Sequence, residues 1–237
     1  MLLLDQTFPT PAENLACDEA LLDWREESGG APILRFWESK VYFVALGYTN
    51  KTLCEVNVDE CTRRGIEVLR RCSGGGTVLQ GAGCFNYALI LPIENETAIL
   101  SNTNRFVMER NRAALSKLLN APVAIRGHTD LAWDERKFSG NAQRRKRRFT
   151  LFHGTFLLDF DLPLLHKVLC VPLVQPEYRN HRAHLDFVRN INSSHDDLRA
   201  ALQTAWRADE PLRDVPFERI QNLAATKYAD PTWNEKF

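Results

Sequence analysis

Apolar residues recur at helical spacing in several segments, and these segments begin and end at typical helix boundaries. Glycines follow two of the segments, at Gly29 and Gly65, and Asp161 and Ser194 stand where N-capping side chains belong. The helices predicted in this way cover residues 12–27, 58–64, 104–119, 161–169, 194–206 and 217–228.

Runs rich in β-branched and aromatic residues alternate with turn residues through the rest of the chain. The predicted strands cover residues 1–5, 33–37, 41–46, 66–69, a run from Thr77, 84–91, 123–126, 130–133, 137–139 and 149–159. Only Glu38-Ser39-Lys40 separates the second strand from the third, which predicts that these two form a hairpin. Residues 171–192 are rich in Pro, Arg and Asn and are expected to form an irregular loop.

The order of these elements bounds the fold. Strands dominate the middle of the chain and helices lie toward both ends, which is typical of an α+β domain with mixed, largely antiparallel β-sheets flanked by helices. The 237 residues are 44% hydrophobic and 25% charged, which is ordinary for a soluble globular protein and sufficient for a sizeable core. No boundary interrupts the pattern, so a single domain over 1–237 is expected.

Charge and cysteine usage narrow the partners and the compartment. The 30 basic and 30 acidic side chains cancel, so the sequence predicts neither nucleic acid nor a membrane as a partner. The first apolar stretch is too short for an export signal, and no apolar run reaches the length of a membrane span. Six scattered cysteines without a C-x-x-C pair indicate reduced thiols in a cytoplasmic protein and argue against structural zinc.

The stretch at residues 70–80 is the first candidate for chemistry. It reads Arg-Arg-Cys-Ser-Gly-Gly-Gly-Thr-Val-Leu-Gln, with three consecutive glycines between two strand-like runs. Glycine lets backbone amides come close to a ligand, and the two arginines supply forked donors suited to phosphate or carboxylate. The stretch therefore predicts an anion-cradling turn, with a flexible hairpin as the alternative. It matches neither a P-loop nor a dinucleotide-binding fingerprint, because the spacings of both are absent.

Four further residues are candidates, each with an ordinary structural alternative. Lys137, beside a Ser-Gly turn, could hold a carboxylate or phosphate, or could be a solvated surface lysine. His153, among apolar strand residues, is either a core histidine or a ligand contact. Asp130 could bind Mg²⁺ as a hard oxygen ligand or simply begin a strand. Cys170, at the end of the predicted helix 161–169, is a candidate nucleophile, although a buried apolar cysteine is the usual case.

The run Arg144-Arg145-Lys146-Arg147-Arg148 is the one dense basic cluster of the sequence. It falls between two predicted strands, so we expect it at the tip of a hairpin. Two interpretations of this cluster remain open: a solvated tip, or a docking surface for an acidic protein partner or for phosphates.

Three segments, taken in order, resemble the signatures of one family. Residues 70–78, followed by Gly-Cys-Phe-Asn-Tyr at 83–87, resemble the R-R-x-S-G-G-G-x-V…N-Y/F pattern of lipoate–protein ligases. Residues 136–143 (Arg-Lys-Phe-Ser-Gly-Asn-Ala-Gln) resemble that family's R-K-x-x-G-x-A-Q segment, and residues 152–155 (Phe-His-Gly-Thr) resemble its H-G-T strand. The resemblance covers most of the chain, and it implies the fold of the biotin/lipoate protein ligase catalytic domain.

The resemblance also implies a reaction in two halves. Lipoate or octanoate reacts with ATP, with Mg²⁺ as a co-substrate ion, and the acyl-adenylate then acylates a lysine of a lipoyl-carrier protein or domain. No permanently bound cofactor is expected. By resemblance, Lys137 is the catalytic residue, which holds the carboxylate and then the acyl-phosphate oxygens. Arg71 is expected to face the phosphates, and Val78, Phe85 and Tyr87 are expected to line the path of the C8 chain. The residues expected to bind substrate or adenylate are Arg71, Ser73, Gly74, Gly75, Gly76, Thr77, Val78, Asn86, Tyr87, Asp130, Ser139, Gly140, Ala142, His153, Gly154 and Thr155.

The sequence departs from the family pattern in ways that matter. Thr129 stands where the ligases usually have Asn, which weakens the prediction that Asp130 binds magnesium. Residues 233–237 resemble the end of the large domain, so a C-terminal accessory domain is expected to be missing and a separate small accessory subunit is a candidate partner. The alternative function is an octanoyltransferase of the same fold, which needs no ATP and works through a cysteine thioester at Cys170. A non-catalytic subunit that only docks the carrier is a third interpretation, against which the intact glycine turn and Lys137 argue.

Overall fold

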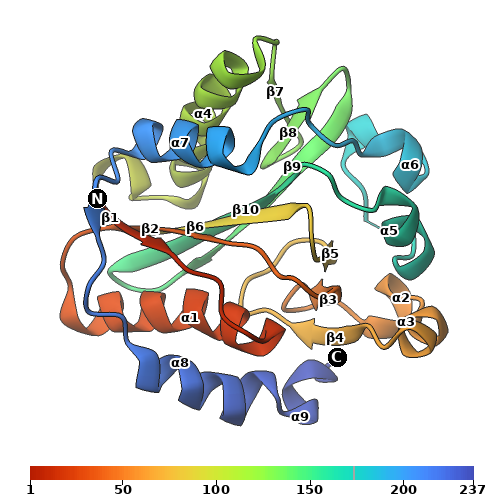
Figure 1. The fold of residues 1–237 in the computed structure, drawn as a ribbon, viewed down its shortest axis with the longest axis horizontal. Coiled ribbons are helices and arrows are strands. Elements are labelled where there is room, and N and C mark those ends of the chain that lie inside the picture. Colours follow the sequence, from red (N-terminus) through yellow and green to blue (C-terminus); the bar gives the residue numbers. More distant parts are fainter. Residues whose placement is uncertain (173) are drawn as a thin grey trace.

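The fold centres on a mixed eight-stranded sheet, here described from a computed structural model that covers residues 1–172 and 174–237. The strands of this sheet are β1 (Leu2–Asp5), β2 (Ile33–Trp37), β6 (Cys84–Pro92), β7 (Ala124–Arg126), β8 (Asp130–Trp133), β9 (Arg136–Arg145), β10 (Phe149–Leu157) and β11 (Glu210–Pro211). Their order across the sheet is β11-β1-β2-β6-β10-β9-β8-β7 (Figure 1). Strand β1 runs parallel to both of its neighbours, and the other pairs are antiparallel.

A second sheet of three strands lies beside the first. It contains β3 (Phe43–Leu46), β4 (Glu67–Arg70) and β5 (Val78–Gln80), with β3 in the middle, parallel to β4 and antiparallel to β5. The predicted hairpin between the strands at 33–37 and 41–46 is therefore wrong. Because β2 pairs with β1 and β6, and β3 pairs with β4 and β5, the short link at residues 38–42 carries the chain from one sheet to the other.

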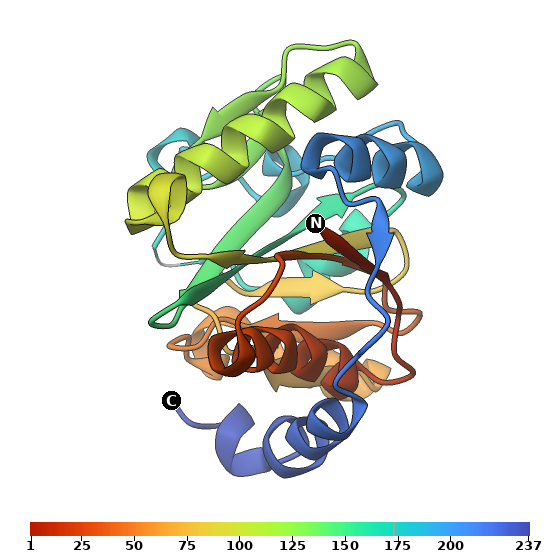
Figure 2. The same cartoon turned by 90° about the vertical axis from the view of Figure 1, so that its left-hand side faces the viewer.

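Helices cover both faces of the large sheet. They are α1 (Pro11–Ser28), α2 (Thr52–Glu55), α3 (Val58–Arg64), α4 (Leu100–Leu119), α5 (Leu162–Val168), α6 (His184–Phe187), α7 (His195–Trp206), α8 (Phe217–Leu223) and α9 (Pro231–Asn234), with single turns η1 (Asn95–Thr97) and η2 (Glu177–Arg179) and a π-helical segment η3 (Ala224–Tyr228). Figure 2 shows α4 and α7 on one side of the sheet, α1 on the other, and α8 outside α1. The mixed α+β prediction is confirmed.

The helix ends follow the signals in the sequence. Thr10 and Glu13 form a reciprocal capping box at the start of α1, and the Asp161 side chain accepts from the backbone of the first turn of α5. The Ser194 side chain accepts in the same way at the start of α7, and Gly65 ends α3 in the left-handed conformation. The predicted loop at 171–192 contains only two short helical turns, η2 and α6, among its described residues; residue 173 lies outside the described part.

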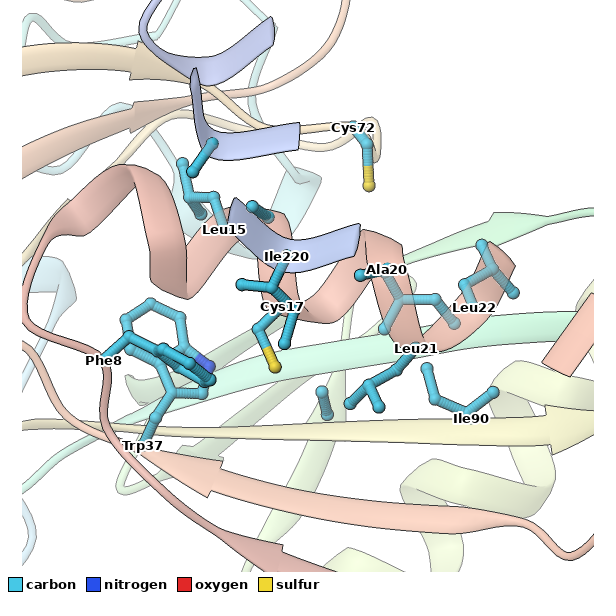
Figure 3. Close-up of a cluster of buried hydrophobic side chains, with 14 of the residues drawn as sticks. Phe8, Leu15, Cys17, Ala20, Leu21, Leu22, Trp37, Cys72, Ile90 and Ile220 are labelled. Atoms are coloured by element: carbon cyan, nitrogen blue, oxygen red, sulfur yellow. The ribbon is translucent and has the colours of Figure 1, made fainter. Parts of the chain in front are cut away.

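Strand β6 contributes side chains to two hydrophobic cores, one on each face of the large sheet. Ala88 and Ile90 face the core under α1, whereas Tyr87, Leu89 and Leu91 face the core under α4 and α7. A strand buried on both faces reads as a continuous apolar run rather than an alternating one, as this sequence does. Figure 3 shows the first core, where side chains of α1 pack between the sheet and α8. In the described part of the chain, none of the helices combines the length and the apolar character that crossing a membrane requires.

Candidate active site

A cavity of about 690 Å³ lies beside the small sheet. Its walls come from β3, β5, the glycine turn at residues 71–77, β6, β8, β9, β10, α5, α6 and the segment between these two helices. Figure 1 shows that these elements meet on the side of the molecule that carries α5 and α6. The fold thus brings the three sequence segments of interest to one place.

All but two of the residues predicted to bind substrate line this cavity. Those that line it are Arg71, Gly75, Gly76, Thr77, Val78, Asn86, Tyr87, Asp130, Lys137, Ser139, Gly140, Ala142, His153, Gly154 and Thr155. Ser73 and Gly74 belong to the same turn without lining the cavity, and Ser73 is buried. Phe85 does not line it either, because its side chain packs in the core under α4 and α7.

Lys137 lies in the polar part of the cavity, near the start of β9. Its ammonium donates to Oδ1 of Asp130 at 2.7 Å, and the hydroxyl of Tyr178 donates to Oδ2 of the same carboxylate at 2.7 Å. A Cβ at Gly140 would stand 2.8 Å from the end of Lys137, so glycine at this position leaves room for the lysine. With 27% of its side chain exposed, Lys137 is not a freely solvated surface lysine.

Asp130 does not fit a resident magnesium ion. Both of its oxygens already accept hydrogen bonds, one from Lys137 and one from Tyr178. Within residues 1–172 and 174–237, no group of three His, Cys, Asp or Glu side chains could hold a metal ion. The structure therefore gives the predicted metal role of Asp130 no support, and the carboxylate instead orients the ammonium of Lys137.

The glycine turn is closed around the guanidinium of Arg71. This side chain donates to the carbonyl oxygens of Gly74 at 2.5 Å, Gly76 at 2.7 Å and Ala45 at 2.9 Å, and to the hydroxyl of Ser73 at 3.1 Å. Burial lowers the pKa of Arg71 to about 10. These contacts use donors of Arg71 to shape the turn that forms the cavity wall, and Arg71 itself lines the cavity, so its expected contact with the phosphates stays a prediction.

Close packing requires glycine at two positions of the cavity wall. Gly47 is not among the predicted site residues, and Gly154 is predicted as a substrate contact rather than for its packing. A Cβ on Gly47 would overlap the carbonyl oxygen of Gly75, which itself has a φ of +86°. A Cβ on Gly154 would overlap Oδ1 of Asn141, the atom that accepts from the hydroxyl of Tyr87 at 2.7 Å. Glycine at these positions therefore keeps the cavity wall thin where two backbone segments meet.

Arg70 connects the glycine turn to the C-terminal segment. Its buried guanidinium donates to the carbonyl oxygens of Gly47 at 3.0 Å and Asn50 at 2.7 Å. It also donates to the carbonyl oxygens of Trp233 at 3.2 Å and Asn234 at 2.9 Å, and the Trp233 indole donates back to the Arg70 carbonyl at 2.8 Å. Residues 233–234 therefore support the loop that packs against the turn.

A buried chain of polar side chains runs from the glycine turn to α1. The hydroxyl of Ser73 lies 2.6 Å from Nε2 of His153, and Nδ1 of His153 lies 3.0 Å from Oδ2 of Asp18. Arg35 donates to the other Asp18 oxygen at 2.5 Å. A carboxylate only accepts, so Nδ1–H of His153 donates to Asp18. His153 is thus both a cavity-wall residue and a satisfied internal one.

Asp18 is the charged centre of this chain. Burial alone raises the pKa of Asp18, but Arg35 and His153 outweigh that effect and hold the pKa below its ordinary value. Asp18 is not among the residues predicted from the sequence, because it lies in a helix whose spacing indicates only packing. The available signal was a pair of carboxylates, Asp18 and Glu19, within an apolar stretch that includes Cys17 and Ala20.

Cys170 lines the same cavity as Lys137. Its backbone N–H donates to the carbonyl oxygen of Glu55 at 3.0 Å. All six cysteines are free. The position of Cys170 in this cavity suits a nucleophile.

The segment between α5 and α7 contributes residues that the sequence analysis missed. Tyr178, Arg179 and His184 come to the cavity region from η2 and α6, and Arg179 and His184 are buried. Burial lowers the pKa of His184 to about 4, with further contributions from Arg179 and His166. Polar residues in a stretch rich in Pro and Arg are typical of a loop, so the sequence gives only a weak indication that these three residues belong to a site.

The basic run at 144–148 does lie at the turn between β9 and β10, as predicted. Most of it is engaged with the protein itself: Arg144 donates to the Cys72 carbonyl at 2.8 Å, and Lys146 pairs with Asp23 at 2.5 Å. Arg145 donates to the Thr97 carbonyl at 3.1 Å. These three side chains are bound to other parts of the protein, so they are neither freely solvated nor presented as an open docking surface.

Residues 10–205 match the family model described as the lipoyl protein ligase A/B catalytic domain. The chain belongs to this family. The family comprises enzymes that handle lipoyl and octanoyl groups, in agreement with the resemblance of the three sequence segments.

Relatives within the family carry two different activities in their names. Octanoyltransferase LipM of Brevibacillus brevis is 24% identical in an alignment of 262 positions, gaps included, that covers 95% of this chain and 95% of the relative. A chain from the structural work on a bipartite lipoate protein ligase and its E2 lipoyl domain from Thermoplasma acidophilum has a TM-score of 0.84 and 25% identity, over 99% of this chain and 95% of that chain. A lipoate-protein ligase A bound with ATP has the same TM-score and identity, over 99% and 98%. Membership of the family therefore identifies an enzyme without separating the ligase from the transferase.

Proposed function

We propose that this protein is a lipoate–protein ligase, which activates lipoate or octanoate with ATP and transfers the acyl group to a lysine of a lipoyl-carrier domain. The observation that carries the proposal is the position of Lys137, whose ammonium shares a cavity with the glycine turn and pairs with Asp130 at 2.7 Å. A lysine in this position is a point charge for carboxylate or phosphoryl oxygens. Apolar side chains such as Val78 and Leu165 line another part of the cavity and suit a C8 chain.

Two transfers account for the proposed reaction. In the first, a carboxylate oxygen of the acid attacks the α-phosphorus of ATP, and pyrophosphate leaves as the acyl-adenylate forms. In the second, the ε-amine of the acceptor lysine attacks the acyl carbonyl carbon and loses a proton, and AMP leaves. Lys137 is the proposed catalytic residue, because its charge offsets the negative charge that builds on acyl and phosphoryl oxygens. The mixed anhydride is already activated, so no nucleophile from the enzyme is required.

The other predicted residues that line the cavity are proposed to contact the acyl-adenylate. Gly75 and Gly76 are exposed on the turn, and their backbone would lie against the ligand, whereas Ser73 and Gly74 hold the turn in place. The ATP-dependent route is supported by the similarity to a ligase bound with ATP.

The alternative is an octanoyltransferase that works through Cys170. Its thiolate would attack the octanoyl thioester of a carrier protein and expel the carrier thiol, and the acceptor lysine would then attack the enzyme thioester and release Cys170. Two observations favour this route: Cys170 lines the cavity that holds Lys137, and the chain is similar over nearly its whole length to octanoyltransferases.

We also propose the partners and the compartment. A lipoyl domain is the acceptor, since a similar ligase has an E2 lipoyl domain as its partner, and the bipartite nature of that ligase supports a separate accessory subunit here. Residues 1–237 then act as a single catalytic domain. The free state of all six cysteines supports a reducing, cytoplasmic compartment.

The deciding experiment measures pyrophosphate release and lipoyl-domain acylation by the purified chain with lipoate and ATP. The ligase proposal expects both activities, retained in Cys170→Ser and in the matched control Cys54→Ser, whose cysteine is exposed and outside the cavity. The transferase alternative expects no pyrophosphate release but octanoyl transfer from a carrier thioester, lost in Cys170→Ser and kept in Cys54→Ser. Acylation that needs neither Lys137 nor Cys170 would overturn both.

A further inference from the structure

Arg179 is a buried cation with unused donors. Only 4% of the residue is exposed, and its NH2 nitrogen has no hydrogen-bond partner among residues 1–172 and 174–237. The recorded side-chain hydrogen bond of Arg179 runs from Nε to the carbonyl oxygen of Arg182 at 3.1 Å. Burying a guanidinium donor without an acceptor costs free energy. The presence of such a donor in the folded protein therefore points to a ligand that accepts its hydrogen bond.

Arg179 is among the residues that line the cavity that contains Lys137. Lys137 already has the carboxylate of Asp130 as its partner, and Asp18 is neutralised by Arg35, whereas Arg179 has no ion pair among the described residues. The positive charge of Arg179 is therefore left uncompensated by the protein in this part of the cavity. An anionic ligand group is the chemical complement of such a position.

The polar neighbours of Arg179 do not supply that anion. His184 lines the same cavity, and its Nδ1 also has no hydrogen-bond partner in the described part of the chain. Because burial, together with Arg179 and His166, lowers the pKa of His184 to about 4, this imidazole is neutral near pH 7 and adds a hydrogen-bonding group without a second charge. Gln175 contributes a buried, unpartnered Oε1 to the same lining.

The guanidinium is held in place before any ligand arrives. Nε of Arg179 donates to the carbonyl of Arg182, and Nε of Arg182 donates back to the carbonyl of Arg179, each at 3.1 Å. The guanidinium carbon also lies 4.7 Å from the ring centroid of Phe187. A fixed, planar fork loses little conformational entropy when it forms two parallel hydrogen bonds to one anion.

We propose that Arg179 binds the phosphate ester of the acyl donor, as a second anion contact separate from the carboxyl contact at Lys137. This proposal rests on the acyl-transfer function proposed for the cavity. Both routes bring such a group to the site: the ligase route brings the phosphate of the nucleotide, and the transferase route brings the 4′-phosphate of a carrier's pantetheine arm. The forked guanidinium suits a phosphate oxygen pair in either case.

The first test measures anion binding without any turnover. Inorganic pyrophosphate is added to the full chain, and the thermal midpoint is recorded for the wild type, for Arg179→Met and Arg179→Lys, and for the control Arg63→Met on the exposed face of α3. The wild type and Arg63→Met are expected to rise with pyrophosphate, Arg179→Lys to rise less, and Arg179→Met to stay unchanged. An equal rise in Arg179→Met would overturn the proposal whatever the reaction is.

Unliganded stability separates binding from a structural role. Because the guanidinium of Arg179 has only one recorded side-chain hydrogen bond, Arg179→Met is expected to keep the thermal midpoint of the free protein or to raise it. A clear fall in both Arg179→Met and Arg179→Lys would assign Arg179 to structure and contradict the proposal.

The second test identifies the source of the phosphate. If ATP is the source, Arg179→Met raises the KM for ATP by about tenfold to a hundredfold and leaves the KM for lipoate nearly unchanged. If the carrier arm is the source, the same rise appears with octanoyl-4′-phosphopantetheine and is absent with octanoyl-pantetheine, which lacks the phosphate. Unchanged KM values for both phosphorylated donors would overturn the inference. Failure of the ligase proposal alone would remove ATP turnover but would leave the pyrophosphate response of the wild type intact.

Discussion

Nε2 of His153 stands 2.6 Å from the hydroxyl of Ser73, and this contact fastens the glycine turn to the middle of the large sheet. Because Nδ1 of the same ring is bound to Asp18, the turn is anchored through α1 as well. Ser73, His153 and Asp18 are in the order of a hydrolase triad, but Ser73 is buried and also accepts from Arg71, so its hydroxyl is not presented to a substrate. We interpret the chain as positioning rather than nucleophilic.

Replacement of Asp18 tests this anchoring role through stability. Asp18→Asn leaves Arg35 buried without its counter-charge, so we expect the free energy of unfolding to fall by about 3–5 kcal/mol. Urea denaturation followed by circular dichroism measures the change. The matched control is Glu60→Gln on the exposed face of α3, where a similar loss of Arg contacts should change stability little. Equal effects of the two substitutions would show that the buried Asp18–Arg35 pair contributes no more to stability than the Glu60 pairs do.

Asp18 also predicts the direction of a pH dependence. Its pKa in the folded protein is lower than the ordinary value of about 3.9 in an unfolded chain, so below that value the unfolded state binds more protons than the folded state. The stability contributed by Asp18 is therefore complete above about pH 4 and is lost as the pH falls through the folded pKa. Urea midpoints measured from pH 6 down to pH 2.5 should fall more steeply in the wild type than in Asp18→Asn. Parallel curves would contradict this account.

Lys137→Ala should remove acyl transfer while the protein stays folded. The lysine is partly exposed and its one recorded ion pair is with Asp130, so its loss costs little stability, whereas the charge it offers to the reacting oxygens cannot be replaced. We expect at least a hundredfold loss of lipoyl-domain acylation, which corresponds to about 2.7 kcal/mol of lost transition-state stabilisation. Acylation of a lipoyl domain, followed by mass spectrometry, provides the measurement, and the thermal midpoint provides the control. Near-normal acylation would refute the role assigned to Lys137.

Gly47→Ala should displace the glycine turn, although Gly47 is outside the glycine run. Its new Cβ would overlap the carbonyl oxygen of Gly75, so the wall of the cavity must shift. We expect a lower thermal midpoint and a higher KM for the acyl substrate. Gly74→Ala is the matched control, because no atom lies within 4 Å of a Cβ there and its φ is not in the left-handed region, so its stability should stay within about 0.5 kcal/mol of the wild type. The reverse order of effects would contradict the packing argument.

The local elements of this fold could be predicted from the sequence, because their signals are themselves local. Helix α1 was predicted over 12–27 and covers Pro11–Ser28, and the predicted helix over 58–64 coincides with α3, which Gly65 ends. Strand β6 was predicted over 84–91 and covers Cys84–Pro92. Capping side chains and apolar periodicity act within one or two turns of chain, so one sequence suffices to detect them.

Pairing between distant strands could not be predicted in the same way. The link at residues 38–42 has the length of a hairpin loop, yet β2 and β3 enter different sheets because their partners, β1 and β6 on one side and β4 and β5 on the other, lie elsewhere in the chain. The same holds for the site. Its glycine turn and Lys137 are visible in the sequence, whereas Asp18, Gly47 and Arg179 gain their significance only from neighbours that the fold brings to them.

The hydrogen bonds between Arg70 and residues 233–234 affect the order in which parts of the fold form during synthesis. The ribosome releases the chain from its N-terminus, so most strands of the large sheet can pair while the segment that supports the loop at 47–50 is still being synthesised. We therefore expect nascent chains shorter than about 233 residues to hold a largely formed sheet and an unfinished cavity. The cavity wall at Asn50 is then completed only when Trp233 and Asn234 reach Arg70.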